Sequence, residues 1–137
     1  MRVSPIILAP AGVAVALGAC ATPPVAERAE VTGTATYRER ILLPPGHVLT
    51  VRLEDVSLAD APARVLAEQV TPLEGRAPPY PFALAYDPAV IQASHNYAVR
   101  AEIRDEGGRL RFTTDTHHGV ITRGAPTSVD IVMVGAR

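Results

Sequence analysis

The chain opens with an apolar stretch that is shorter than a membrane span. Apolar residues run from Ile6 to Leu17 behind a positive start at Met1-Arg2, which is the order found in an export signal with an apolar region of about 7–15 residues. A membrane-spanning helix needs about 20 apolar residues, and this stretch also carries Pro5 and Pro10, which disfavour a helix. We therefore predict that residues 1–19 are a signal peptide that is removed.

From Val31 onward, apolar and polar residues alternate, which is typical of half-buried strands. The clearest alternations predict strands at residues 31–38, 48–56, 97–104, 110–115 and 127–134. Residues 63–70 have a composition that also suits a helix, but their short length and the following Pro72 favour a strand. Another strand is expected at residues 82–86, at a sheet edge or start because prolines surround it, and residues 87–93 suit a single helical turn or a loop.

Turn residues predict two strand pairings. Pro44-Pro45-Gly46 separates the first two predicted strands, which indicates an antiparallel pair of residues 31–38 and 48–56. Gly107-Gly108 predicts a hairpin whose register pairs Ile103 with Phe112 on the apolar face and Arg100 with Asp115 on the polar face. Short strands with turns at intervals of roughly 10 residues predict an all-β fold, a single small antiparallel β-sandwich of about seven strands.

Length and charge limit the remaining possibilities. The 137 residues include 13 basic and 14 acidic side chains, for a net charge of −1, and every basic residue is arginine. After removal of residues 1–19, we expect a tether over residues 20–29, extended by Pro23-Pro24, and one domain over residues 30–137. The balanced charge argues against binding to nucleic acid, and against binding to an anionic membrane through charge alone.

Cys20 is the single cysteine of the chain and closes the sequence Leu17-Gly18-Ala19-Cys20. These four residues resemble the lipobox of bacterial lipoproteins, in which a diacylglyceryl group is joined to the cysteine sulfur before cleavage leaves that cysteine as the N-terminus. The alternative is an ordinary signal peptide with an incidental free thiol. Two or more acyl chains anchor a protein stably. Because Ala21, and not aspartate, follows Cys20, the resemblance implies an outer-membrane lipoprotein that faces the periplasm.

Several ordered blocks of the predicted domain carry a family resemblance. They run from Val31 to Pro45, Val51 to Ser57, Phe112 to Thr116 and Thr122 to Pro126, and together they resemble the YbaY/YscW-type lipoproteins, a group that includes the pilotins, or secretion lipoprotein chaperones, of type III secretion systems. The resemblance implies a β-sandwich lipoprotein without a known catalytic site. It also implies that one branch of the family escorts an outer-membrane secretin and assists its assembly.

No catalytic motif is evident along the chain. There is no Gly-x-Ser-x-Gly elbow, no His-Glu-x-x-His zinc helix and no phosphate-binding glycine loop. His117-His118 is the only adjacent pair of histidines. Neighbours on a strand point to opposite faces, so only a loop would bring them together on one metal ion, with His47 or His95 as a third ligand. We therefore predict a protein that is not an enzyme and has neither a cofactor nor a metal site.

Two functions of different classes remain. The first is a chaperone-like, pilotin-like envelope factor that binds an outer-membrane or other envelope protein, and the segments flanking Thr71 to Tyr86 are where a partner strand would add to an open sheet edge. The second is a small-ligand or envelope-polymer binding module, for glycans or lipids, which requires a concave and partly apolar pocket.

Overall fold

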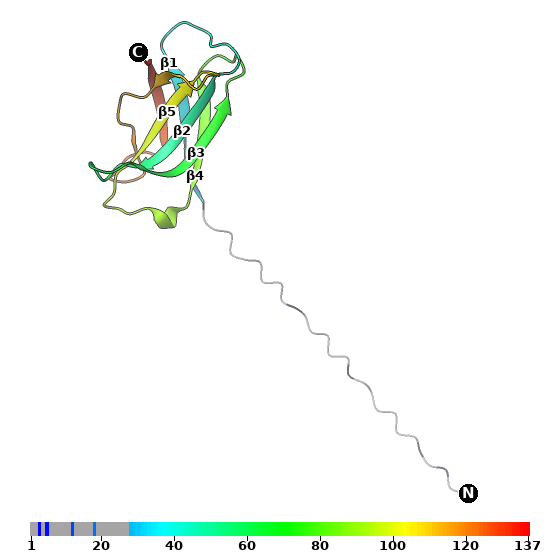
Figure 1. The fold of residues 1–137 in the computed structure, drawn as a ribbon. Coiled ribbons are helices and arrows are strands. Elements are labelled where there is room, and N and C mark those ends of the chain that lie inside the picture. Colours follow the sequence, from blue (N-terminus) through cyan, green and yellow to red (C-terminus); the bar gives the residue numbers. More distant parts are fainter. Residues whose placement is uncertain (1–2, 4, 6–11, 13–17, 19–27) are drawn as a thin grey trace.

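The computed structural model describes residues 3, 5, 12, 18 and 28–137, and almost all of its regular structure is β-strand (Figure 1). One turn of 3-10 helix, η1, accompanies the strands. The elements are β1 (Ala29–Tyr37), β2 (Val48–Asp55), β3 (Arg64–Pro72), β4 (Tyr80–Tyr86), η1 (Pro88–Val90), β5 (Tyr97–Arg104), β6 (Leu110–Thr113), β7 (Gly119–Val120) and β8 (Ser128–Gly135). The all-β prediction is confirmed.

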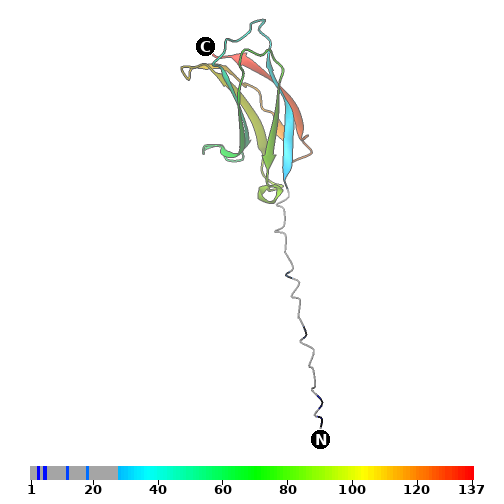
Figure 2. The ribbon, with the colours of Figure 1, turned by 90° about the vertical axis from the view of Figure 1, so that its right-hand side faces the viewer.

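The strands form one sheet that curls on itself into a nearly closed barrel. Their order is β3-β2-β5-β6-β8-β1-β4, and β7 pairs with β5 beside this path. Figure 2 shows two layers that curve around a common interior. A sandwich has two separate sheets, whereas here the short strand β6 pairs with both β5 and β8 and so connects the layers. Strands β3 and β4 end the path.

Alternating side chains of the strands fill the interior. On β2, Leu49, Val51 and Leu53 are fully buried, while the intervening residues point outward. Tyr37 stacks on Phe112 with ring centroids 4.5 Å apart. Each such large apolar side chain contributes about 1.5–3 kcal/mol when it is fully buried. The core also includes Val31, Ala35, Tyr80, Phe82, Leu84, Tyr86, Val99, Ala101, Ile103, Ile131 and Met133.

The predicted pairing of the first two strands is wrong. β1 lies between β4, to which it is antiparallel, and β8, to which it is parallel, whereas β2 lies between β3 and β5. The connection does not form a tight hairpin, because it crosses from one half of the sheet to the other and buries Leu43 in the core on the way. Gly33 permits the close approach of β8, since a Cβ at this position would lie 1.7 Å from the carbonyl oxygen of Val129.

The predicted hairpin is correct in its first part. Ile103 pairs with Phe112 as expected, but the predicted pairing of Arg100 with Asp115 is wrong, because β6 ends at Thr113. Pairing with β5 resumes where Ala98 lies opposite Gly119. The stretch between β6 and β7 is therefore longer than the part of β5 that it faces. The segment 114–118 leaves the regular ladder there.

The remaining strand predictions are confirmed with small shifts in their ends. The ambiguous segment after Ala63 is strand β3, the proline-rich region contains the edge strand β4, and the expected helical turn is η1. Strand β7 was not predicted, because two residues are too few to show an alternating pattern.

Candidate functional site

The two ends of the sheet path, β3 and β4, face each other across an open seam. Within the described residues, β3 pairs as a strand only with β2, and β4 pairs only with β1. Each of these strands therefore has one edge whose backbone groups are not used by a neighbouring strand. Such an edge is a template for pairing with another chain.

A single glutamine side chain bridges the seam. The backbone N–H of Ala83 on β4 donates a hydrogen bond to Oε1 of Gln69 on β3, at 2.9 Å. The Nε2 group of the same glutamine donates to Oγ1 of Thr71 at 3.0 Å, which holds the amide in place. The Gln69 carbonyl thus takes the part that a backbone carbonyl of a neighbouring strand would play.

The open edge of β4 offers backbone groups to a further strand. Because the N–H of Ala83 points away from β1, the alternation of an antiparallel strand directs the groups of Pro81 and Ala85 the same way. Pro81 has no N–H, so it contributes only a carbonyl. Proline on an edge also limits uncontrolled pairing. The inward side chains beside this edge, Phe82 and Leu84, belong to the core.

Strand β3 combines exposed apolar residues with features that limit aggregation. Val65 and Val70 are 46% and 55% exposed. The pairing with β2 has a bulge at Leu53/Glu54, which twists the edge. Glu68 lies between the two valines and forms an ion pair with Arg52 at 2.6 Å. The bulge and the charged side chain are features that limit unspecific pairing at an open sheet edge.

The loop between β3 and β4 is held by local hydrogen bonds. Arg76 donates to the carbonyl oxygens of Leu73 and Pro72, and the Tyr80 hydroxyl donates to the carbonyl of Arg76 at 2.8 Å. Burial raises the pKa of Tyr80, and the neighbouring Tyr37 adds to the rise, so the hydroxyl remains a donor at physiological pH. Leu73 is fully buried, which anchors the loop to the core.

The predicted lipid attachment lies outside this region. Leu17, Ala19 and Cys20 are outside the described residues, while Gly18 is described and exposed. Attachment of lipid to Cys20 therefore stays a prediction. No helix in the described part of the chain has the length and apolar character to cross a membrane.

The histidines are distributed over separate parts of the barrel. His47 Nδ1 lies 2.8 Å from the carbonyl of Pro44, His95 is bonded to Asp55, and His117 is exposed while its neighbour His118 is partly buried. Among the described residues, no group of three histidine, cysteine, aspartate or glutamate side chains is placed to hold a metal ion.

A polar cluster that the sequence did not reveal fixes the start of β5. The Asp55 carboxylate accepts hydrogen bonds from the Ser57 hydroxyl at 2.5 Å and from the Ser57 backbone at 3.0 Å, and it lies 2.7 Å from Nδ1 of His95. The serine oxygen itself accepts the N–H of Asn96. The Ser57 hydroxyl is bonded to the Asp55 carboxylate and not to the His95 imidazole. In a catalytic serine–histidine pair, the hydroxyl would instead be bonded to the imidazole that acts as its base. The Asp-x-Ser spacing was a possible signal for the local turn, but nothing in the sequence pointed to His95.

Burial opposes ionisation of Asp55, but hydrogen bonds from Ser57 and His95 outweigh it and lower the pKa of this carboxyl. The charged form is therefore the one that the cluster stabilises.

Comparison with known proteins agrees with this architecture. Residues 26–133 match the family described as type III secretion system lipoprotein chaperone (YscW). The chain is 40% identical over 111 residues to the uncharacterized lipoprotein YbaY of Escherichia coli K12, which covers 81% of this chain and 57% of that protein. The chain thus spans little more than half the length of this relative.

A solved structure shares both sequence and fold with the chain. It is that of an alternative pilotin from the type II secretion system of Vibrio cholerae, with 49% identity and a TM-score of 0.77, covering 81% of this chain and 99% of that one. The predicted resemblance is therefore confirmed: the chain belongs to the YscW family of lipoprotein chaperones.

Proposed function

We propose that this protein is a non-catalytic, pilotin-like chaperone of the bacterial envelope, which binds an extended segment of an outer-membrane or other envelope protein along the β3 and β4 edges. The observation that carries this proposal is the open seam, which a single side-chain hydrogen bond from Ala83 to Gln69 bridges. Membership of a chaperone family and likeness to a pilotin support it.

A partner strand would bind by taking over one hydrogen bond of the seam. A partner strand that adds to β4 replaces the Gln69 carbonyl with its own backbone carbonyl as the acceptor of the Ala83 N–H. The added strand would also pair with the backbone carbonyl of Pro81 and with the backbone N–H and carbonyl of Ala85. Alternate side chains of the partner meet the apolar margin near Phe82 and Leu84, where burial contributes about 25 cal/mol for each Å² of apolar surface.

Two substitutions at the seam separate this mechanism from general destabilisation. Ala83→Pro removes the backbone N–H of Ala83, which points to the open edge and is not used in the pairing of β4 with β1. This variant should reduce partner capture at least tenfold. Gln69→Ala removes only the internal acceptor, so capture should be retained or increased. Capture is measured in cells with a photo-crosslinking residue at the exposed Val70 of β3, and with the same residue at Val134 of β8 as a control. Equal capture by both seam variants, or no reproducible protein at position 70, would contradict the proposal.

The lipid anchor is a separate part of the proposal. We infer that diacylglyceryl is attached at Cys20 and that residues 20–29 hold the domain at the outer membrane, facing the periplasm. The nine residues 21–29, when extended, reach roughly 30 Å, which would keep the domain close to the membrane surface. Intact mass spectrometry of membrane-purified protein should show acyl chains that the Cys20→Ala variant lacks. A mature protein without acyl chains would refute the anchor but leave the edge-binding mechanism open to the test above.

A second function, binding of a lipid-like ligand, is favoured by one observation. An open groove of about 420 Å³ is lined mainly by apolar side chains, with Arg123 among them; the other lining residues are Tyr86, Pro88, Ile91, Ala93, Ile121 and Thr122. An acyl chain would lie along the apolar wall, with an acidic head group near Arg123. Titration with a fluorescent fatty acid tests this function, because binding that Ile121→Asp leaves unchanged would exclude the groove.

A further inference from the structure

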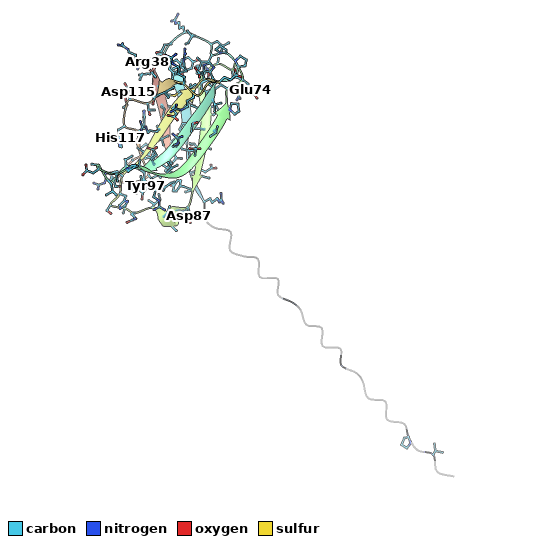
Figure 3. All side chains as sticks on the ribbon, in the orientation of Figure 1. Arg38, Glu74, Asp87, Tyr97, Asp115 and His117 are labelled. Atoms are coloured by element: carbon cyan, nitrogen blue, oxygen red, sulfur yellow. The ribbon has the colours of Figure 1, made fainter. Side chains whose placement is uncertain are left out.

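A second cleft, with charged walls, lies beneath the segment 114–118. It has a volume of about 260 Å³ and lies over the outward residues of β2 and β5. In Figure 3, Asp115 and His117 lie on the opposite side of the barrel from Glu74 of the β3–β4 loop. The cleft is formed where β6 ends and the chain carries extra residues before β7. The cleft therefore exists because strand pairing opposite β5 is interrupted, and it is separate from the seam between β3 and β4.

A glutamate residue with little exposed surface lies in the wall of this cleft. Glu54 is only 7% exposed, yet within the described part of the chain no hydrogen bond or ion pair reaches its carboxylate. Arg52, two residues earlier on the same face of β2, is bonded to both Glu68 and Glu102. The carboxylate oxygens of Glu54 are not among the fully buried side-chain atoms that lack a partner, so they face the open space of the cleft. A carboxylate without a protein partner that faces a cleft is placed to pair with a cation from outside.

Two more polar atoms without partners belong to the same cleft. Among the described residues, the buried side-chain atoms that lack a hydrogen-bond partner are Oγ1 of Thr114 and Nε2 of His118, and both residues line the cleft. Burial lowers the pKa of His118, with a further lowering from His117 and a rise from Asp115. The imidazole is therefore neutral at physiological pH, and such a ring presents one nitrogen as an acceptor. Buried polar atoms in folded proteins are rarely left unsatisfied.

The remaining walls suit a short alkyl chain. Val56, Ala63 and Ala98 supply apolar surface. The volume is below the range of about 300–1,000 Å³ that is typical of pockets for drug-sized ligands. A group no larger than one long side chain is the better match. Arg100 is exposed at the cleft, and the two carboxylates of Glu54 and Asp115 outnumber it, so the formal charge of these three side chains is negative.

We propose that this cleft binds a primary alkylammonium group, with Glu54 as its counter-ion and the apolar wall holding its methylene chain. An ammonium has three donors and no acceptor, which complements a carboxylate, a hydroxyl oxygen and a neutral imidazole nitrogen. The group has two sources in the envelope, a lysine side chain of a bound protein or a free polyamine. The inference goes beyond the proposed edge binding and does not depend on it.

Calorimetric titration of the purified lipoprotein with n-pentylamine tests the proposal, with n-pentanol as the neutral control. We expect saturable binding of the amine and none of the alcohol. Glu54→Gln should weaken amine binding by about tenfold or more, because a hydrogen bond to a charged group contributes about 1.5–3 kcal/mol. Asp115→Asn, at an exposed position, should weaken it by a smaller factor, and Glu68→Gln, an exposed carboxylate of the same sheet face, should leave it unchanged.

Absence of amine binding, or binding that Glu54→Gln does not weaken, would overturn the proposal. Ala83→Pro should leave amine binding intact, so that failure here and failure at the seam are distinguished. Carbodiimide crosslinking in cells then identifies the source. An amide bond between Glu54 and a lysine of another protein assigns a protein partner, whereas spermidine that binds tighter than pentylamine, without such a crosslink, assigns a polyamine.

Discussion

The side-chain carbonyl of Gln69 accepts the backbone N–H of Ala83 at 2.9 Å, across the line where the curled sheet fails to close. In a closed barrel, a backbone carbonyl would occupy this position. The barrel is therefore almost complete, and its last contact is made by a group that can rotate away. At the seam the sheet therefore lacks only the pairing of β3 with β4 to be closed.

Gln69→Ala should loosen the seam without unfolding the barrel. We expect the amide hydrogen of Ala83 to exchange faster with solvent, and the free energy of unfolding to fall by about 1 kcal/mol, the usual net value of one hydrogen bond. Native-state hydrogen exchange followed by NMR measures both effects. Gln92→Ala is the control, because Gln92 is exposed and its side chain makes no hydrogen bond within the described residues. An unchanged Ala83 amide would show that the bridge is not formed in solution.

Gly33→Ala should disrupt the parallel pair of β1 and β8. A Cβ on Gly33 would lie 1.7 Å from the carbonyl oxygen of Val129, so one strand must move. We expect a loss of about 3 kcal/mol in the free energy of unfolding, measured by urea titration. Gly107→Ala is the matched control, because the nearest atom to its Cβ would be 3.4 Å away. Equal stabilities of the two variants would contradict this packing.

Asp55→Asn should remove a source of stability that depends on pH. The pKa of Asp55 is lower in the folded protein than its ordinary value, so its contribution is present above the ordinary carboxyl pKa of about 3.9 and is lost as the pH falls through the folded value. At pH 7 the variant should be less stable by about 1.5–3 kcal/mol, and the difference should shrink in acid. Urea unfolding across pH 2–7 measures this, with the exposed Asp60→Asn as control.

His118→Gln should reduce the loss of stability in mild acid. Since burial and His117 lower the pKa of His118 despite the opposing effect of Asp115, the unfolded chain binds a proton first as the pH falls below about 6.5. Stability is therefore full above this pH and declines as the pH falls toward the lower folded pKa. Unfolding free energies at pH 7.5 and 5.5 should differ less in the variant than in the wild type. An equal decline in both proteins would show that another group is responsible.

The alternation of apolar and polar residues was sufficient to predict most strands. Strands such as β2 and β5 are buried on one face only, and this asymmetry produces the period of two on which the predictions relied. The Gly107-Gly108 turn in addition predicted the register of Ile103 with Phe112 correctly. Periodicity says nothing about which strand lies beside which, because β1 has the same alternation whether its neighbour is β2 or β8. The wrong pairing of the first two strands has this cause.

The candidate sites were less accessible to sequence reasoning. The prolines around Tyr80 did place the edge strand correctly, because proline cannot donate to a sheet ladder. However, the acceptor role of Gln69 depends on the distance across the seam. The low exposure of Glu54 depends on the irregular segment opposite β5. His95 lies 40 residues from its partner Asp55, and no short motif records such a contact.

The parallel pair of β1 and β8 has a consequence for how the chain reaches its final form. The first and last strands lie side by side, and Thr34 bonds to Asp130 across a separation of 96 residues. Contacts of high sequence separation slow folding, because a large loop must close before they form. A chain that is synthesised from its N-terminus therefore cannot complete the barrel until strand β8 has emerged. Until then β1 and β4 lack their connection to the rest of the sheet, because only β8 joins β1 to β6.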